Sequence, residues 1–306
     1  MRTLFVAVAL LSFATAASAC DVCGCSAGGQ YTGILPQFHR HFLGLHWSEQ
    51  SFLSAHTRSA ARAGRFDSEE SFRSVDIIGR IYLRPRLQLL TLAPYCDFRR
   101  MDLETGEETR TSGLGDISVM AAYVLLDTGD SLRRHWRHTL TLGGGVKLPT
   151  GQHRLSNVEG QLLHPNLQPG SGTTDFLLTA TYTLRYGAWG LSGEAAGKIN
   201  TANREREYRF GNRISGAARV FYWKNAGKFA LLPGAGVAVD ASQANSGDPD
   251  YTEGTGGTAL YGIAGLDVYA GRFAAGINYQ HPLAGQLGGG KIKNRARWTL
   301  SVNYIF

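Results

Sequence analysis

Apolar and polar residues alternate with a period of two along most of this chain. The alternation is clearest at the end of the sequence, where the even positions from Trp298 to Phe306 are apolar and the odd positions from Arg297 to Asn303 are polar. A period of two indicates a β-strand that has one apolar face and one polar face. We therefore take each such segment as a strand.

The same pattern predicts twelve strands. In three of them, 41–53, 86–97 and 258–269, both faces carry apolar residues. A tilted strand of roughly 9–11 residues crosses a bilayer, and every predicted segment is long enough. The predicted strands are 41–53, 73–84, 86–97, 115–127, 135–148, 174–186, 189–200, 210–223, 228–241, 258–269, 272–281 and 294–306.

The predicted connections alternate between short and long. The long polar ones are 54–72, 98–114, 149–173, 201–209, 242–257 and 282–293, and short turns lie between them. Short periplasmic turns and long external loops are typical of outer-membrane barrels, and an even strand number leaves both ends in the periplasm. The prediction is an all-β protein: residues 41–306 form a transmembrane, antiparallel, up-and-down β-barrel of about twelve strands.

The N-terminus predicts the compartment. Residues 1–19 combine an early Arg, a short apolar stretch and a small-residue cleavage site, which together indicate a secretory signal peptide. Residues 20–40 are rich in Cys and Gly and lack any period, so they could form a plug, a disulfide or a metal site. We expect the mature chain to reside in the outer membrane of a Gram-negative cell.

Composition narrows the class of protein. The chain has 39 Gly among 306 residues, 10% aromatic residues and 18% charged residues. Many aromatics and few charges argue against disorder, and the absence of a Gly-X-Y period excludes collagen. After the N-terminus no run of 18 uncharged apolar residues occurs, which argues against a helical membrane protein.

Charged residues on the polar faces would line the barrel interior, because charges facing lipid are costly. They have two interpretations: a network of internal ion pairs that holds the barrel shape, and a permeation path for polar or anionic solutes. The candidate lumen residues are Arg80, Arg84, Asp116, Arg137, Lys147, Asp175, Arg185, Glu194, Lys198, Arg213, Arg219 and Arg297, together with Asp76, Asp240, Asp267 and Arg295. Asp116 and Asp175 could also cap turns at the external rim.

The cysteines allow three hypotheses. Cys20, Cys23 and Cys25 form a C-x2-C-x-C pattern, which an oxidising periplasm would permit to form a disulfide. With His39 and His41 nearby, the same thiolates could bind copper or zinc. Cys20 could also be lipidated. No other cofactor is predicted.

Enzymatic activity is not expected. The chain has no Gly-x-Ser-x-Gly, HExxH or Walker sequence. His153, His164, Asp248 and Asp250 fall in long predicted loops, where loop polarity explains them. Nucleic-acid binding is not expected either, because the basic residues are spread over twelve strands.

Short motifs carry a family resemblance. GLGD at 113–116 and GTTD at 172–175 open strands, and KLPTG at 147–151 closes one. This arrangement resembles the meta-pathway phenol-degradation family of outer-membrane transporters, which is distantly similar to FadL-type hydrocarbon channels. The terminal Phe306 resembles the signal read by the barrel-assembly machinery.

The resemblance implies a channel for passive uptake of small organic solutes, aromatic or anionic. Besides that machinery and the solute, the expected partners are outer-membrane lipid and lipopolysaccharide. The alternatives are a metal-handling barrel that uses the N-terminal cysteines and an outer-membrane enzyme.

Overall fold

The computed structural model describes residues 40–55, 66–129, 136–205, 207–247, 252 and 254–306. Nearly all regular structure in these ranges is strand, with two short 3-10 turns, η1 (Pro165–Leu167) and η2 (Gly288–Gly290). No helix in the described ranges is long and apolar enough to cross a membrane.

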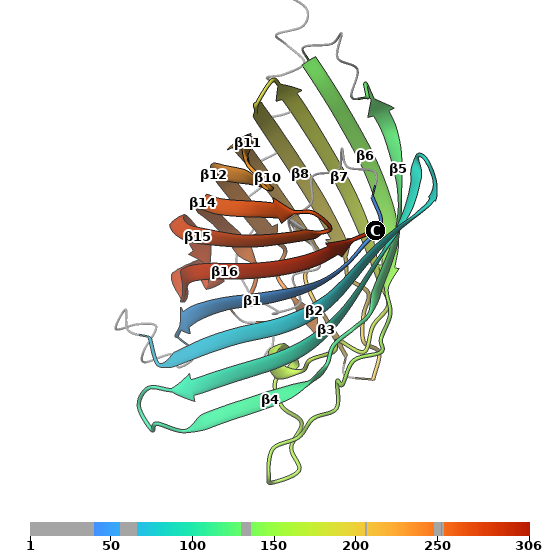
Figure 1. Ribbon diagram of the computed structural model, residues 1–306. Helices are drawn as coiled ribbons and strands as arrows, with labels where there is room; N and C mark the ends of the chain where they lie inside the picture. Colours follow the sequence, from blue (N-terminus) through green and yellow to red (C-terminus); the bar gives the residue numbers. More distant parts are fainter. Residues whose placement is uncertain (1–39, 56–65, 130–135, 206, 248–251, 253) are drawn as a thin grey trace, which may run out of the picture.

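Twelve strands form a closed antiparallel barrel (Figure 1). Each pairs with its neighbours along the chain, β1 pairs with β16, and the β10–β12 pair completes the ring. The strands are β1 (Phe42–Ser54), β2 (Ser68–Arg84), β3 (Leu87–Asp102), β5 (Ser118–Asp127), β6 (Trp136–Lys147), β7 (Asp175–Tyr186), β8 (Trp189–Ile199), β10 (Arg213–Tyr222), β12 (Phe229–Ser242), β14 (Gly257–Ala270), β15 (Phe273–Leu287) and β16 (Ile292–Ile305). The predicted fold and strand number are confirmed.

Four short strands lie outside this ring: β4 (Glu108–Leu114), β9 (Tyr208–Arg209), β11 (Lys224–Ala226) and β13 (Ser246–Gly247). The prediction of a loop over 98–114 was wrong, because β3 continues to Asp102 and β4 pairs back onto it. Both faces of this hairpin carry polar residues, and Phe98 is the one large apolar side chain in it that is buried, so the segment lacks the continuous apolar alternation by which strands were predicted. Likewise, β15 continues to Leu287, where a loop was expected from residue 282.

The two ends of the barrel differ as predicted. At one end the connections are short, and Gly187, Gly227 and Gly271 adopt positive φ in three of the turns. We call this the short-turn end. At the other end lie the longer connections, including 148–174 and 200–212. We call this the long-loop end; β9 and β13 pair there and tie two loops together.

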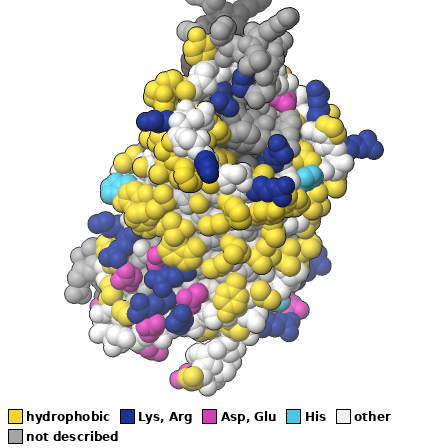
Figure 2. Space-filling view, in the orientation of Figure 1, with side chains coloured by type: hydrophobic (Ala, Val, Ile, Leu, Met, Phe, Trp, Pro, Cys, Tyr) yellow, Lys and Arg dark blue, Asp and Glu magenta, His cyan; other side chains and the backbone are white. Residues whose placement is uncertain are grey.

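An apolar belt crosses the face of the barrel seen in Figure 2, and exposed large apolar side chains occur on all twelve barrel strands. It consists of outward side chains such as Leu43, Leu45, Val75 and Ile77, which are 44–56% exposed, whereas the alternating positions on the same strands are buried or half-buried. Above and below the belt in this view, charged residues replace the apolar ones. This is the surface that a bilayer requires of a β-barrel.

Inward-facing glycines allow long side chains to lie flat on the inner wall. A Cβ added at Gly190 would lie 2.0 Å from Cζ of Phe221, and one added at Gly44 would lie 2.0 Å from Oδ1 of Asn303. Side chains from neighbouring strands therefore occupy the space above these residues. The high glycine content thus has a packing role inside the barrel as well as a role in turns.

Candidate functional site: the barrel interior

Except for Arg295, the predicted lumen residues lie on the inner face, at its rims or in the adjoining loops. They occur at three levels: the long-loop mouth, the middle and the short-turn end.

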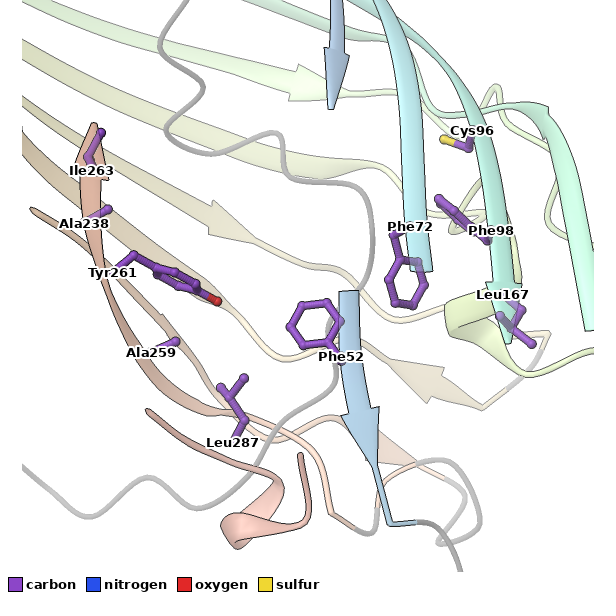
Figure 3. Packing of buried hydrophobic residues seen from close by; sticks show 10 residues of the cluster. All are labelled: Phe52, Phe72, Cys96, Phe98, Leu167, Ala238, Ala259, Tyr261, Ile263 and Leu287. Carbon is purple, nitrogen blue, oxygen red and sulfur yellow. The ribbon is translucent and has the colours of Figure 1, made fainter. Parts of the chain in front are cut away.

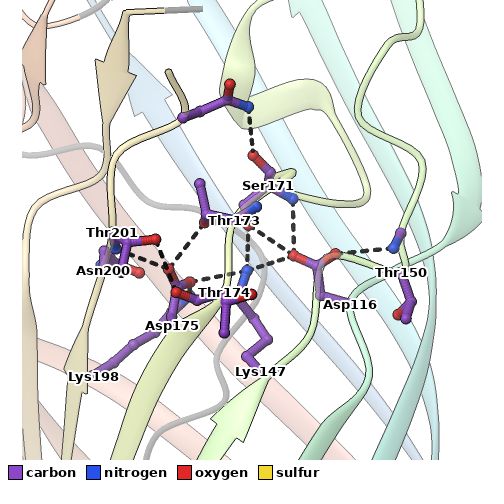
Figure 4. A network of polar contacts seen from close by, with 12 residues as sticks. Asp116, Lys147, Thr150, Ser171, Thr173, Thr174, Asp175, Lys198, Asn200 and Thr201 are labelled. Carbon is purple, nitrogen blue, oxygen red and sulfur yellow. Dashed lines mark hydrogen bonds and ion pairs between the residues drawn. The ribbon is translucent and has the colours of Figure 1, made fainter. Parts of the chain in front are cut away.

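A buried cluster of charges lies at the long-loop mouth (Figure 4). Nζ of Lys147 lies 2.5 Å from Oδ2 of Asp116 and 2.9 Å from Oδ2 of Asp175, and Nζ of Lys198 lies 3.4 Å from the same Asp175 oxygen. Lys147 also donates to the hydroxyl of Ser171. The four charged side chains are at most 8% exposed. The GLGD, KLPTG and GTTD motifs thus meet in one network.

This network fixes the long loop between β6 and β7. Backbone N–H groups of Gly151 and Ser171 donate to the Asp116 carboxylate at 2.9 Å each, and the N–H of Thr201 donates to Asp175 at 3.0 Å. Both aspartates therefore receive turn N–H groups in addition to their ion pairs. The loop is held at both of its ends.

The ionised form of Asp116 is favoured. Burial alone would raise the pKa of this carboxyl, but the Lys147 ammonium and the hydrogen bonds outweigh burial and hold the pKa of Asp116 below its usual range. Buried ions are stable only when they are paired and hydrogen-bonded, so each member of the cluster depends on the others.

A second ion pair lies flat against the inner wall in the middle of the barrel. Nη2 of Arg219 on β10 donates to Oδ2 of Asp267 on β14 at 2.9 Å, and both side chains are at most 6% exposed. Arg219 reaches Asp267 across β12 because the wall is glycine there: a Cβ at Gly234 would lie 3.2 Å from its Nε. Glu194 lies on the neighbouring strand β8, with the same inward orientation.

Arg297 forms the third interior contact. Its Nη1 lies 2.5 Å from Oδ2 of Asp240, and its guanidinium carbon lies 4.0 Å from the centre of the Tyr261 ring. A guanidinium over an aromatic face is a cation–π contact. Arg213 lies opposite Lys198 in the β10–β8 register, near the long-loop mouth.

At the short-turn end the arginines contact aromatic rings. The buried Arg80 lies over the rings of Phe42 at 4.8 Å and Tyr82 at 5.6 Å, and Arg185 lies over Trp223 at 5.4 Å. Arg137 is half-buried on the inner side of β6, and Arg84 is exposed at the rim.

Arg295 was wrongly predicted to face the interior. It lies on the outer surface, where its Nη1 contacts Oε1 of Glu69 at 2.6 Å. The cause is a register shift between β1 and β16: Gln50 pairs with Arg297, whereas Phe52 pairs with Asn294. Two intervening residues on β16 face one on β1, and this bulge reverses the orientation of the side chains beyond it.

An apolar cluster lies inside the barrel near the long-loop end (Figure 3). Phe52, Phe72 and Phe98 come from three adjacent strands, with ring centres 6.0 Å and 5.1 Å apart in edge-to-face contacts. All three are at most 2% exposed. The other members of the cluster are Cys96 on β3, Leu167 in η1, Ala238 on β12, Ala259, Tyr261 and Ile263 on β14, and Leu287 on β15.

The sequence contained a partial signal for this cluster. Three predicted strands, 41–53, 86–97 and 258–269, had apolar residues on both faces, and they supply Phe52, Cys96 and Tyr261. In a barrel whose interior is mostly polar, apolar residues on the inner face indicate a local apolar cluster. Phe72 and Phe98 were missed because they lie just beyond the predicted strand limits.

Of the residues predicted to bind a metal, Cys20, Cys23, Cys25 and His39 lie outside the described residues. His41 is described: its Nδ1 accepts a hydrogen bond from the N–H of Tyr82 at 3.1 Å, and its ring stacks on Phe306 at 5.6 Å. These contacts hold the residue before β1 against β2 and against the residue after β16, where the first and last strands of the barrel pair.

The loop histidines considered for catalysis have structural contacts. Nδ1 of His153 lies 3.1 Å from the carbonyl oxygen of Gly151, and His164 caps η1 by accepting from the N–H of Asn166 at 3.3 Å. Asp248 and Asp250 lie outside the described residues.

Comparison with known proteins agrees with this architecture. An outer-membrane channel from Pseudomonas putida F1 is 15% identical, with a TM-score of 0.61 over 91% of this chain and 99% of that one. The β domain of the Bordetella autotransporter BrkA is 14% identical, with a TM-score of 0.54 over 87% of this chain and 99% of that one. At these identities, both show a shared fold.

The sequence matches one family model, described as "Putative MetA-pathway of phenol degradation", over residues 51–277. No curated protein matches the chain.

Proposed function

This chain belongs to that phenol-degradation family, and we propose that it forms an outer-membrane channel through which small aromatic solutes diffuse passively. The observation that carries the proposal is the aromatic cluster of Phe52, Phe72 and Phe98 on an inner wall that is otherwise rich in polar residues. The three rings are at most 2% exposed, so a solute would reach them by replacing side chains that now cover them. Only a solute with apolar surface could do so without exposing the rings to a polar environment.

The order of side chains along β14 suggests how such a solute would move. From the long-loop end, the inner face presents Ala259, Tyr261 and Ile263, followed by Gly265 and then Asp267. A solute entering from outside would therefore meet apolar groups first and the Arg219–Asp267 pair next.

Polar groups near this route would favour solutes with a hydroxyl or carboxylate on the ring. Arg297 lies against Tyr261 within the apolar cluster, and Arg219 follows deeper in the barrel. Guanidinium groups donate to oxygen acceptors and also stack on aromatic rings. Aromatic acids and phenols combine these two properties, so they are the proposed solute class.

The test compares solute permeability in proteoliposomes. We expect benzoate to pass faster than gluconate, which has a similar size and charge but no apolar ring. Phe72→Leu removes the inner ring and keeps an apolar side chain. Because an aromatic contact contributes about 0.5–1.5 kcal/mol, benzoate permeability should change by roughly 2–10-fold.

Phe176→Leu is the matched control, since Phe176 is 51% exposed and lies on the lipid-facing side of β7. It should leave the benzoate-to-gluconate ratio unchanged. The proposal fails if the purified barrel shows no solute flux and no conductance in planar bilayers. It also fails if both substitutions alter the ratio equally.

A further inference from the structure

The short-turn end of the barrel is strongly basic. Its described turns and strand ends contain one acidic residue, Asp127. The basic residues in the same turns and strand ends are Arg40, Arg84, Arg86, Arg137, Arg185, Lys224, Lys228 and Arg272. In Figure 2, Lys and Arg predominate above the apolar belt, whereas basic and acidic residues mix below it.

Exposed aromatic rings line the outer surface at the same end. They form close pairs across neighbouring strands: Trp136 with Tyr186 at 4.7 Å between ring centres, Trp189 with Tyr222 at 4.9 Å, and Phe273 with Tyr304 at 5.3 Å. All six are 36–59% exposed. Such rings prefer the level of the lipid headgroups.

Basic residues of the turns lie one or two residues from exposed rings in the chain. Lys228 precedes the exposed Phe229, Arg272 precedes Phe273, and Lys224 follows Tyr222 by two residues. All three basic side chains are exposed. They thus extend from the edge of the apolar belt, where headgroups would lie. We call Lys224, Lys228, Arg272 and the six paired rings the basic collar.

The long-loop end has a different electrostatic arrangement on its outer wall. There Arg73 pairs with Glu49, Arg99 with Glu108 and Arg110 with Asp97, each at 2.8 Å, and Arg295 pairs with Glu69 at 2.6 Å. Each of these four arginines is therefore neutralised by an acidic partner. The excess of positive charge is therefore a property of the short-turn end.

We propose that the basic collar binds the phosphate headgroups of anionic phospholipids in the periplasmic leaflet. Ammonium and guanidinium groups bind phosphate through charge-assisted hydrogen bonds, and the neighbouring rings occupy the headgroup level. A lipid fits this surface better than an acidic protein does, because the basic residues adjoin lipid-facing aromatics. The proposal rests on the proposed outer-membrane location, but it does not depend on solute conduction.

Lipid preference can be measured by tryptophan quenching. The full chain is reconstituted in vesicles of phosphatidylcholine mixed with brominated phosphatidylglycerol. Vesicles of brominated phosphatidylcholine mixed with phosphatidylglycerol serve as the reference. Every protein measured carries the substitutions Trp47→Phe and Trp298→Phe. Trp136 and Trp189, which face lipid at the short-turn end, then dominate the quenching. The variant K224Q/K228Q/R272Q neutralises the collar, and R73Q/R110Q/R295Q neutralises three arginines at the other end.

Each basic residue near an anionic surface strengthens binding by about fivefold. The parent should therefore favour phosphatidylglycerol severalfold over phosphatidylcholine, and the collar variant should lose most of this preference. The long-loop variant should keep it. The proposal is overturned if the parent has no preference, if both triple variants lose it equally, or if the collar binds an acidic peptide while showing no lipid preference. Normal benzoate flux in a collar variant would separate this proposal from the channel function.

Discussion

Replacing Lys147 with Met should destabilise the barrel more than any exposed charge replacement. Lys147 lies between two carboxylates at 2.5 and 2.9 Å, and Lys198 is 3.4 Å from only one of them. Methionine nearly preserves the length of the side chain and removes its charge. Asp116 would then be buried without its principal cation.

The expected size follows from burial. Removing one partner of a buried ion pair typically costs about 3–5 kcal/mol, because the remaining charge stays away from water. Asp116 keeps hydrogen bonds from Gly151 and Ser171, which places the loss toward the lower part of that range. The double variant K147M/D116N removes both charges and leaves the Asp175–Lys198 pair. It should therefore cost less than K147M alone.

The free energy of unfolding can be measured by urea titration in lipid vesicles, followed by tryptophan fluorescence. Hydrogen exchange over residues 148–174 would show whether the loop is released first. A loss below about 1 kcal/mol for K147M would mean that the cluster contributes no more than a surface pair. A double variant less stable than K147M would refute the pairing argument itself.

Three further predictions concern the acid response of Asp116, the inner-wall glycines and the N-terminal cysteines. Because Asp116 has a lowered pKa, its stabilising effect should be complete above the ordinary carboxyl range and be lost as pH falls below about 4, through the lowered value; a D116N variant should show a smaller acid-induced loss in the same urea titration. Gly190→Ala should cost about 1–3 kcal/mol, because its Cβ would overlap the Phe221 ring, whereas Gly193→Ala, with no atom within 4 Å, should be neutral in a thermal melt. If the N-terminal cysteines hold copper or zinc, elemental analysis should find about one metal ion per chain, and a C20S/C23S/C25S variant should contain none; equal metal content in both would exclude those thiols as ligands.

The alternating pattern predicted the barrel because each membrane-crossing strand must present an apolar face to lipid. In segments that extend beyond the lipid-facing belt, the prediction was less accurate. The β3–β4 hairpin has polar residues on both faces, so it was taken as a loop. Arg295 was placed inside because simple alternation cannot show a bulge, which depends on pairing with Phe52 and its neighbours.

The interior was predictable in part for a similar reason. Charged residues such as Lys147 and Asp175 were expected inside, but the sequence could not show which of them meet. Their contact depends on how the loop between β6 and β7 folds back. The aromatic cluster was indicated only by strands that are apolar on both faces, and Phe72 lay outside the predicted limits.

The glycines of the inner wall have a consequence for the calibre of the barrel. Arg219 lies flat because Gly234 and Gly265 leave space beneath its side chain. A methyl group would lie 3.2 Å from Nε of Arg219 at Gly234 and 3.3 Å from Nη1 at Gly265, which would move the guanidinium by a few tenths of an ångström toward the barrel axis. Substrate range in such barrels could therefore change through residues behind the lining, and glycine-to-alanine exchanges would adjust the aperture in small steps.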